Sequence, residues 1–261
     1  MKIYDSHTHL NDRSFAGHVS HYIQHAHRLG VVKMNLAGSN QAMNATALKI
    51  AHQYPNVYAI IGWHPEELKN YDEQQEALLK KQLHDPAVVG VGEIGLDYYE
   101  NQTKHALQKR VFRRQVEIAK ALHLPVQIHT RRAFADTYQI LKDEHVAEIG
   151  GVIHSFDGDP YWMKKFLSLG MDVSYSGIAS FKSAHAVHQA VKVTPLDRML
   201  VETDAPCLAP APYRGHMNEP ANTLYTVEAV ARLRDTTPDV IAKATYQNTI
   251  RLFGTGQNET N

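Results

Sequence analysis

Eight short apolar runs, separated by segments with helical periodicity, restrict the possible folds of this chain more than any other feature. The runs begin near residues 2, 31, 57, 87, 124, 150, 171 and 198, and they are rich in Val, Ile and Leu, as buried parallel strands are. Between them, stretches such as "KHALQKRVFRRQVEIAKALH" repeat apolar residues at the spacing of one helix face. The pattern therefore predicts a strand followed by a helix, eight times over.

Eight such units in 261 residues predict a single-domain (β/α)8 TIM barrel of the α/β class. The alternative is an open doubly wound sheet, which would carry a Gly-rich phosphate loop after the first strand, where this chain has "HTHLND". We expect the barrel domain to span residues 1–253 and to end with two helices, at about Thr223–Arg234 and Pro238–Phe253. Gly254 then ends the last helix, and the polar tail 254–261 is expected to fray.

The composition limits the partners and the location of the protein. Lys and Arg total 27, as do Asp and Glu, and the pI is about 7.3, whereas a domain that grips duplex DNA by its backbone is expected to exceed about 9. Any contact with nucleic acid should therefore be local. The single cysteine excludes an intramolecular disulfide, and no signal peptide or membrane span is recognisable. We expect a cytoplasmic protein without membrane association or an obligate protein partner.

Metal-ligating residue types stand at the ends of most of the predicted strands. His7 and His9 lie one residue apart in "IYDSHTHLND", so both face the same side of an extended strand. The later strands end in His64, Glu93, His129, His154, and the pair Glu202 and Asp204. All these ends meet at one mouth of a barrel, where active sites of this fold lie. Imidazole nitrogens and carboxylate oxygens together suit divalent transition metals.

We expect this mouth to hold two divalent metal ions (Zn, Mn, Mg, Ni or Co). Glu93 is the natural bridge between them, with one ion held by His7, His9 and Asp204 and the other by His129 and His154. Two ions about 3.5 to 4 Å apart can share a hydroxide and hold both the attacking and the leaving oxygen, so hydrolysis is implied, with Asp204 and Glu93 at the reaction itself. The remaining local charge of about +1 would attract a phosphodiester.

Two arginines are candidates for substrate binding. Arg131 directly follows the fifth strand and Arg214 lies in "PYRGHMNEP", and a guanidinium fork suits phosphate. A loop salt bridge is the alternative for each. The aromatic residues Trp63, Tyr98 and Tyr99 lie beside ligand-bearing strand ends, where they could stack on unpaired bases, with core packing or loop anchoring as the alternative.

Eight short motifs occur in order over almost the whole chain. They are "DSHTHL", "GWHP", "VGEIGLDYY", "QIHTRRA", "IHSFDG", "LVETDAP", "PYRGHMNEP" and "NTIRLFG". In order and spacing they resemble the TatD-type metal-dependent deoxyribonucleases of the amidohydrolase superfamily. The resemblance implies a (β/α)8 barrel, hydrolysis of DNA, and metal ligands at His7, His9, Glu93, His129, His154 and Asp204.

The same resemblance suggests roles for further residues. It places His64 at the substrate phosphate, and Asp97, Glu202 and Arg214 around the mouth. Glu202 lies two residues before Asp204 and should face the same way, so we expect it to orient a ligand from behind. One position departs from the family pattern, because Cys207 follows "ETDAP" where the family often carries tyrosine. Specificity differs if that tyrosine lines the substrate groove, and we expect Cys207 itself to be a small buried thiol.

Three functions are consistent with these residues. The first is a TatD-like DNase that acts as a 3′–5′ exonuclease on ends of single-stranded DNA. The second is an amidohydrolase or esterase acting on a small molecule, or a D-aminoacyl-tRNA deacylase, since the same centre can attack a carbonyl carbon. The third is a non-catalytic scaffold that binds metal or nucleic acid. Glu93 favours the first, because many C–N hydrolases of the superfamily bridge their metals with a carboxylated lysine instead.

Overall fold

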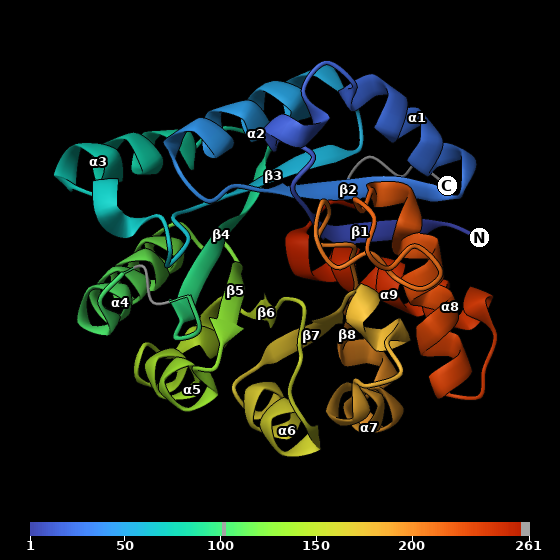
Figure 1. The fold of residues 1–261 in the computed structure, drawn as a ribbon. Helices are drawn as coiled ribbons and strands as arrows, with labels where there is room; N and C mark the ends of the chain where they lie inside the picture. Colours follow the sequence, from blue (N-terminus) through green and yellow to red (C-terminus); the bar gives the residue numbers. More distant parts are fainter. Residues whose placement is uncertain (101–102, 257–261) are drawn as a thin grey trace.

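Parallel strands alternate with helices along residues 1–100 and 103–256, which the computed structural model describes (Figure 1). The strands are β1 (Ile3–Thr8), β2 (Val31–Ala37), β3 (Val57–Ile61), β4 (Val88–Asp97), β5 (Val126–Arg131), β6 (Gly151–Ile153), β7 (Met171–Tyr175) and β8 (Met199–Val201). The helices are α1 (Val19–Arg28), α2 (Gln41–Gln53), α3 (Glu73–Gln82), α4 (His105–Ala121), α5 (Phe134–Asp143), α6 (Pro160–Ser168), α7 (His185–Val193), α8 (Thr223–Leu233) and α9 (Pro238–Phe253).

The predicted (β/α)8 barrel is confirmed. Within the described residues the strands form one sheet in the order β1 to β8, and every pair of neighbours is parallel. The strand starts agree with the apolar runs to within two residues. Beyond the end of β8, the Asp204 N–H donates to the His7 carbonyl over 3.0 Å, and the His9 N–H donates to the Ala205 carbonyl over 2.7 Å. The barrel seam is therefore joined at three predicted metal ligands.

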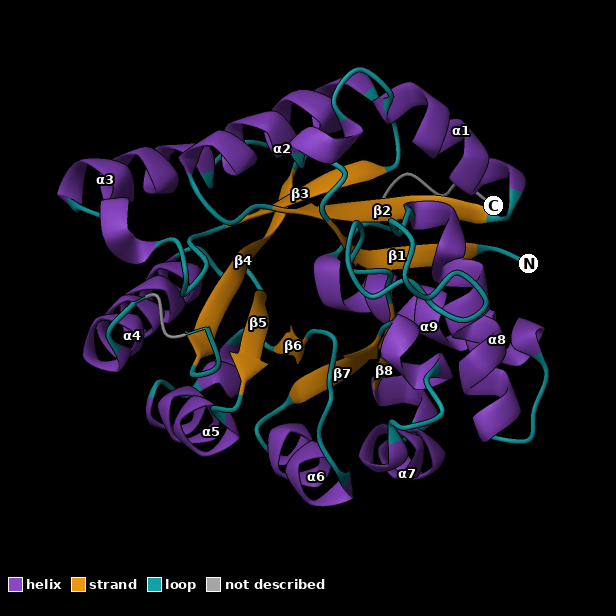
Figure 2. Cartoon of the chain, in the orientation of Figure 1, coloured by secondary structure: helices purple, strands orange, loops and turns teal. Residues whose placement is uncertain are grey.

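Apolar helix faces pack against the outside of the strands, and the helices form the outer layer of the molecule (Figure 2). In α4, for example, the buried Phe112, Val116 and Ala119 recur every three or four residues, and the helix packs against β4. Asn40, at the start of α2, accepts a hydrogen bond from the Met43 N–H, which satisfies one of the free donors of that helix end. No described helix is both long and apolar enough to traverse a bilayer.

The last two helices, α8 and α9, match the predicted ranges to within one residue. Gly254 caps α9 with φ +64°, a left-handed conformation that glycine adopts without steric cost. The residue after Gly254 is not frayed, contrary to the prediction for the tail. Thr255 is buried, and its carbonyl accepts a hydrogen bond of 2.9 Å from the buried Lys33 ammonium group. Residues 257–261 of that predicted tail lie outside the described residues.

Candidate metal centre

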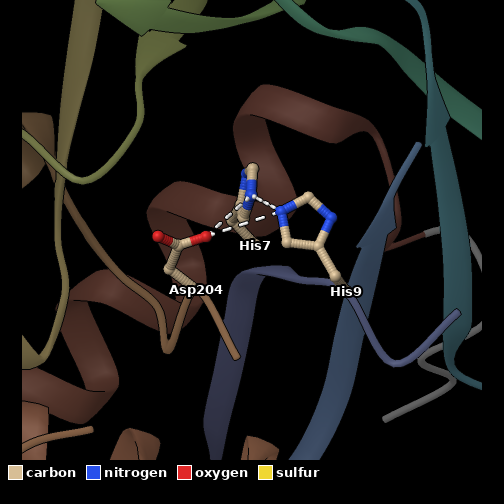
Figure 3. A group of neighbouring side chains, drawn as sticks. All are labelled: His7, His9 and Asp204. Atoms are coloured by element: carbon tan, nitrogen blue, oxygen red, sulfur yellow. Dashed lines mark hydrogen bonds and ion pairs between the residues drawn. The ribbon is translucent and has the colours of Figure 1, made fainter. Parts of the chain in front are cut away.

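Four potential ligand atoms meet at the seam between β1 and the segment after β8. His7 Nε2 and His9 Nε2 lie 3.0 Å apart, and Asp204 Oδ1 is 3.4 and 3.5 Å from them (Figure 3). Glu93 Oε2, from β4, is 3.6 Å from His7 Nε2 and 3.4 Å from His9 Nε2. Tetrahedral ligands about 2.0–2.1 Å from a zinc-sized ion lie roughly 3.3–3.4 Å apart. This group, called the His7 cluster, therefore fits a single divalent cation in donor type and spacing.

The other oxygen of Glu93 faces a second group of imidazoles. Oε1 lies 2.8 Å from His154 Nε2 and 2.9 Å from His129 Nδ1, and the two imidazole nitrogens are 3.4 Å apart. We call this group the His129 cluster. One carboxylate thus presents one oxygen to each cluster, as a bridging ligand does.

Two glycines of "VGEIG" allow β4 to approach β5 closely. Gly95 pairs with His129 in the sheet register and has φ +142°, and a Cβ built there would overlap the His129 backbone carbonyl. A Cβ on Gly92 would lie 2.8 Å from the Gln127 Cβ. Side chains at either position would push the strands apart. The glycines on either side of Glu93 therefore bring its carboxylate to the imidazoles of β5.

Acceptors behind the two histidines of β1 set their tautomers. His7 Nδ1 donates to Gln127 Oε1 over 2.8 Å, and the Gln127 amide is itself oriented by donating to the Ser6 carbonyl over 2.9 Å. His9 Nδ1 donates to the Ala37 carbonyl over 2.9 Å. In each neutral ring the proton then sits on Nδ1, and the lone pair of Nε2 points into the His7 cluster.

Carboxylates take the same place behind the histidines of the His129 cluster. His129 Nε2 donates to Asp97 Oδ2 over 2.9 Å, and His154 Nδ1 donates to Glu202 Oε1 over 3.2 Å. Glu202 Oε1 also accepts the Ser155 N–H over 2.8 Å, which anchors it. Carboxylate–histidine–metal chains of this kind orient the ring and raise its basicity. Asp97 and Glu202 thus lie behind the ligands, where they can orient them.

His64 lies beside the His129 cluster, but its proton is on the nitrogen that faces the centre. Its Nδ1 accepts the Glu66 N–H over 3.2 Å, so in the neutral ring Nε2 carries the proton. That N–H points toward Glu93 Oε1, 3.4 Å away. Burial lowers the pKa of His64, which keeps the ring neutral. The ring therefore offers the centre a hydrogen-bond donor, although its position among Glu93 and His129 would also allow ligation after a change of tautomer.

The carboxylates of the centre are ionised. Glu93 is only 3% exposed, and burial alone would raise its pKa, but the positive charge of His154 is the largest of the effects that hold it well below the usual value. Burial also disfavours a charged His9, but hydrogen bonds and charge from Asp204 and Glu93 raise its pKa to about 10. Protons and a divalent cation therefore compete for the same nitrogen, so cation binding at neutral pH should release protons.

Glu202 offers one more potential metal-ligand atom. Its Oε2 is buried and has no hydrogen-bond partner among the described residues, and Glu202 forms a further potential ligand group with His7 and His154. A buried carboxylate oxygen normally has a hydrogen bond or a metal ion as its partner. The residues present therefore fit resident cations by donor chemistry as well as by spacing.

The two predicted phosphate-binding arginines lie outside both clusters. Arg131 is exposed and forms an ion pair of 2.9 Å with Glu100, which is the loop salt bridge considered above as its alternative. Arg214 is exposed on the segment after β8, and its guanidinium carbon lies 4.3 Å from the centre of the Phe181 ring. Among the described residues, neither guanidinium group forms an ion pair with Glu93 or Asp204.

Gln127 is a residue of the centre that the sequence motifs do not indicate. A polar residue in the apolar run "LPVQIHTR" was the available signal, because the two-residue period of a strand puts Gln127 on the same face as His129. Its contact with His7, 120 positions away in the chain, follows only from closure of the barrel.

The prediction that Cys207 is buried is wrong. The residue is exposed, because its backbone rather than its side chain anchors the turn. The Cys207 N–H donates to the Asp204 carbonyl over 2.8 Å, and the Cys207 carbonyl accepts from Asn218 over 2.7 Å. Desolvation and the nearby negative charge of Asp204 raise the pKa of the thiol to about 11. It is therefore neutral at physiological pH and unsuited to nucleophilic attack.

A family model described as "TatD related DNase" matches residues 4–254. The chain belongs to the TatD family. The chain is thus a TatD family metal-dependent hydrolase, and its two clusters are candidate groups of metal ligands.

Relatives of known sequence and structure agree with membership of the TatD family. The chain is 35% identical over 251 residues to the "uncharacterized metal-dependent hydrolase YabD" of Bacillus subtilis, covering 96% of this chain and 98% of that one. It is 40% identical over 198 residues to the "uncharacterized metal-dependent hydrolase YcfH" of Escherichia coli K12, covering 76% and 74%. The solved structure of YjjV, a TatD homologue from E. coli, superposes with a TM-score of 0.92 at 29% identity, covering 97% and 98%.

Proposed function

We propose that this TatD family hydrolase cleaves phosphodiester bonds at the ends of single-stranded DNA, working from the 3′ side. The observation that carries the proposal is the position of Glu93, whose two oxygens face two separate imidazole clusters. When bound, a pair of cations supplies the Lewis acidity that displacement at phosphorus requires. Paired metal sites commonly cleave phosphodiesters. A phosphodiester is also attracted by the net positive charge of such a site.

Asp204 and His64 have further roles in this reaction, as a proton acceptor and as a hydrogen-bond donor. Burial opposes ionisation of Asp204, but the adjacent side chains of His7 and His9 lower its pKa below the usual range. The carboxylate is therefore ionised at neutral pH and can accept the proton of the attacking water. His64 presents its Nε2–H to a phosphate oxygen that enters beside the His129 cluster, which is the role that the family resemblance implies for it.

The neutral surface favours a strand end over a duplex. With 27 basic and 27 acidic residues, the chain has no excess of positive charge for the many phosphates of a duplex. A mouth ringed by loops admits a flexible single strand, which needs only local contacts. Binding then depends on the centre and on a few side chains around it.

The test is an assay of the metal-reconstituted protein on DNA labelled at the 3′ or the 5′ end, as single strand and as duplex. A panel of esters, amides and D-aminoacyl-tRNA is run beside it. We expect metal-dependent shortening of single strands from the 3′ end, with duplex cut more slowly. If single strands stay intact while an ester or a D-aminoacyl-tRNA is hydrolysed, the nuclease proposal is wrong and the alternative substrate class replaces it.

A further inference from the structure

Two loops at the mouth of the barrel carry positive charge that no acidic residue of their own balances. They follow β7 and β8 and span residues 176–184 and 205–218, and we call them the β7–β8 rim. The rim contains Lys182 and Arg214 but no Asp or Glu. Both residues are exposed, and neither forms an ion pair within the part of the chain that the structure describes. The rim is therefore a local positive region on a chain whose net charge is zero.

The two loops of the rim form one surface. A Cβ on Gly177 would overlap the Leu208 carbonyl oxygen, so the glycine allows the two backbones to approach closely. The Arg214 guanidinium carbon lies 4.3 Å from the centre of the Phe181 ring, in the loop after β7. This cation–π contact holds the charge over the neighbouring loop and leaves its N–H groups without a carboxylate partner among the described residues.

The rim adjoins both clusters of the centre. The loop after β8 begins beside Asp204 of the His7 cluster, and the Cys207 N–H donates to the Asp204 carbonyl over 2.8 Å. The loop after β7 begins at Ser176, whose hydroxyl oxygen is 2.8 Å from that of Ser155. Ser155 directly follows His154 of the His129 cluster. A strand that leaves either cluster on this side therefore meets the rim first.

The other side of the mouth has the opposite balance of charge. β3 and β4 lie across the barrel from β7 and β8 (Figure 2). The loops after β3 and β4 span residues 62–72 and 98–104, and their acidic residues outnumber their lysines: Glu66, Glu67, Asp72 and Glu100 against Lys69 and Lys104. Arg131, beside these loops, is already paired with Glu100 over 2.9 Å. A nucleic acid strand is therefore attracted more to the β7–β8 rim than to this side.

The aromatic residues on the side of β3 and β4 already contact protein groups. Trp63 is 4% exposed, and the Tyr98 hydroxyl donates to a carboxylate of α5 over 2.6 Å. The Tyr99 ring carries the guanidinium groups of Arg131 and Arg132, whose carbons lie 3.8 and 4.6 Å from its centre. Packing and loop anchoring, the alternatives considered for these rings, therefore account for them.

We propose that the uncleaved part of the strand leaves the centre over the β7–β8 rim, where Arg214 and Lys182 bind one of its phosphates. A planar guanidinium group can donate two hydrogen bonds to one phosphate, and the ammonium group adds a second positive charge. This inference rests on the proposed function, because it assigns a path to the strand that the centre would cleave. It keeps the phosphate-binding role predicted for Arg214, adds Lys182 and removes Arg131.

Kinetics with two phosphodiesters test the rim on the metal-loaded full-length protein. A short single-stranded oligonucleotide reaches the rim, whereas bis(p-nitrophenyl) phosphate has no strand beyond the scissile bond. In Arg214→Ala and in Lys182→Ala, KM for the oligonucleotide should rise about three- to tenfold with little change in kcat, while the small diester should be unaffected. Arg28→Ala is the matched control, since it removes an exposed arginine at the end of α1, at the opposite end of the barrel. Arg132→Ala removes one beyond β5, outside the rim.

Photo-cross-linking tests the direction of the strand without relying on turnover. Cys207 is the single cysteine of the chain and is exposed on the rim. Glu67→Cys, combined with Cys207→Ser, places the thiol at a matched position across the mouth. In both turns the backbone N–H donates to the carbonyl of the centre residue three positions earlier, Asp204 or His64. A short photoactivatable group on the thiol should join a hydrolysis-resistant phosphorothioate strand mainly from Cys207.

Four results would overturn the path over the rim. They are an equal rise of KM for both substrates, no rise in either alanine variant of the rim, an equal rise in Arg132→Ala, and cross-linking from Glu67→Cys that equals or exceeds that from Cys207. A wild-type protein that cleaves neither phosphodiester would instead overturn the proposed function itself.

Discussion

At the scale of single residues, the centre depends on which nitrogen of each histidine carries a proton. Four imidazoles have an oxygen acceptor on the outer nitrogen and so direct a lone pair inward. His64 has a backbone donor on the outer nitrogen and directs a proton inward. The same residue type is thus prepared for two tasks, ligation and hydrogen-bond donation, by the group behind it.

Substitution of Gln127 tests whether the acceptor behind a histidine prepares it for metal binding. Gln127→Ala removes the acceptor behind His7, so its tautomer is no longer fixed, and we expect metal affinity to fall about 10- to 100-fold. Isothermal titration with Zn²⁺ or Mn²⁺ measures the change. Asn248→Ala is the matched control, because it removes a buried amide that binds the Leu196 and Met199 carbonyl groups on another part of the barrel. Equal losses of affinity in the two variants would contradict the role assigned to Gln127.

Variants of Glu93 and His154 distinguish a bridging ligand from a ligand of one ion. Glu93→Ala removes a donor from both clusters, so we expect nearly all turnover to disappear and both ions to be loosened. His154→Ala removes a donor from the His129 cluster alone and should chiefly weaken one ion. Metal content after dialysis, measured by elemental analysis, distinguishes the cases. A Glu93→Ala protein that retains its full metal content would show that Glu93 is not a bridge.

At the scale of the elements, α3 and α4 are joined by a charged network around Glu76. Arg114 donates from Nε and Nη2 to Glu76, and Lys80 lies 2.5 Å from the same carboxylate. The hydrogen bonds from Arg114 outweigh burial and lower the pKa of Glu76 from 4.5 to about 2. A lowered carboxylate pKa contributes stability above pH 4.5, and that contribution is lost as the pH falls through 2.

The Glu76→Gln variant should therefore be less stable than the wild type by about 1 kcal/mol at pH 7, as the partly exposed network allows. The difference should shrink steadily below pH 4.5. Urea unfolding at several pH values between 7 and 3 measures it. A stability difference that is constant over this range would mean that the amide lowers stability through packing and not through charge.

The sequence predicted the elements well, but only part of the contacts between them. Apolar runs locate the strands because both faces of a barrel strand are buried, and strand ends locate the ligands because they share one mouth. The partner of His7 could not be predicted, since Gln127 lies on β5, a strand that does not neighbour β1 in the sheet. The exposure of Cys207 and the pairing of Arg131 with Glu100 were also out of reach, because turns and loops set them without a periodic signal.

At the scale of the whole molecule, a net charge of zero should appear in the salt dependence of substrate binding. If one or two phosphates are held by the centre and His64, the logarithm of the apparent affinity for single-stranded DNA should fall with a slope on the order of −1 to −2 against log salt. Steady-state KM is measured at KCl concentrations from about 50 to about 300 mM, a range that includes physiological ionic strength. Its dependence on the salt concentration gives this slope. A much steeper slope would indicate an extended phosphate-binding surface.

The central claim is that Glu93 bridges two resident cations, and anomalous diffraction from crystals grown with Mn²⁺ or Zn²⁺ tests it most directly. We predict two anomalous peaks about 3.5 to 4 Å apart, one beside His7, His9 and Asp204 and the other beside His129 and His154, with one oxygen of Glu93 directed to each. A single peak at saturating metal, or a second peak that Glu93 does not touch, would contradict the account.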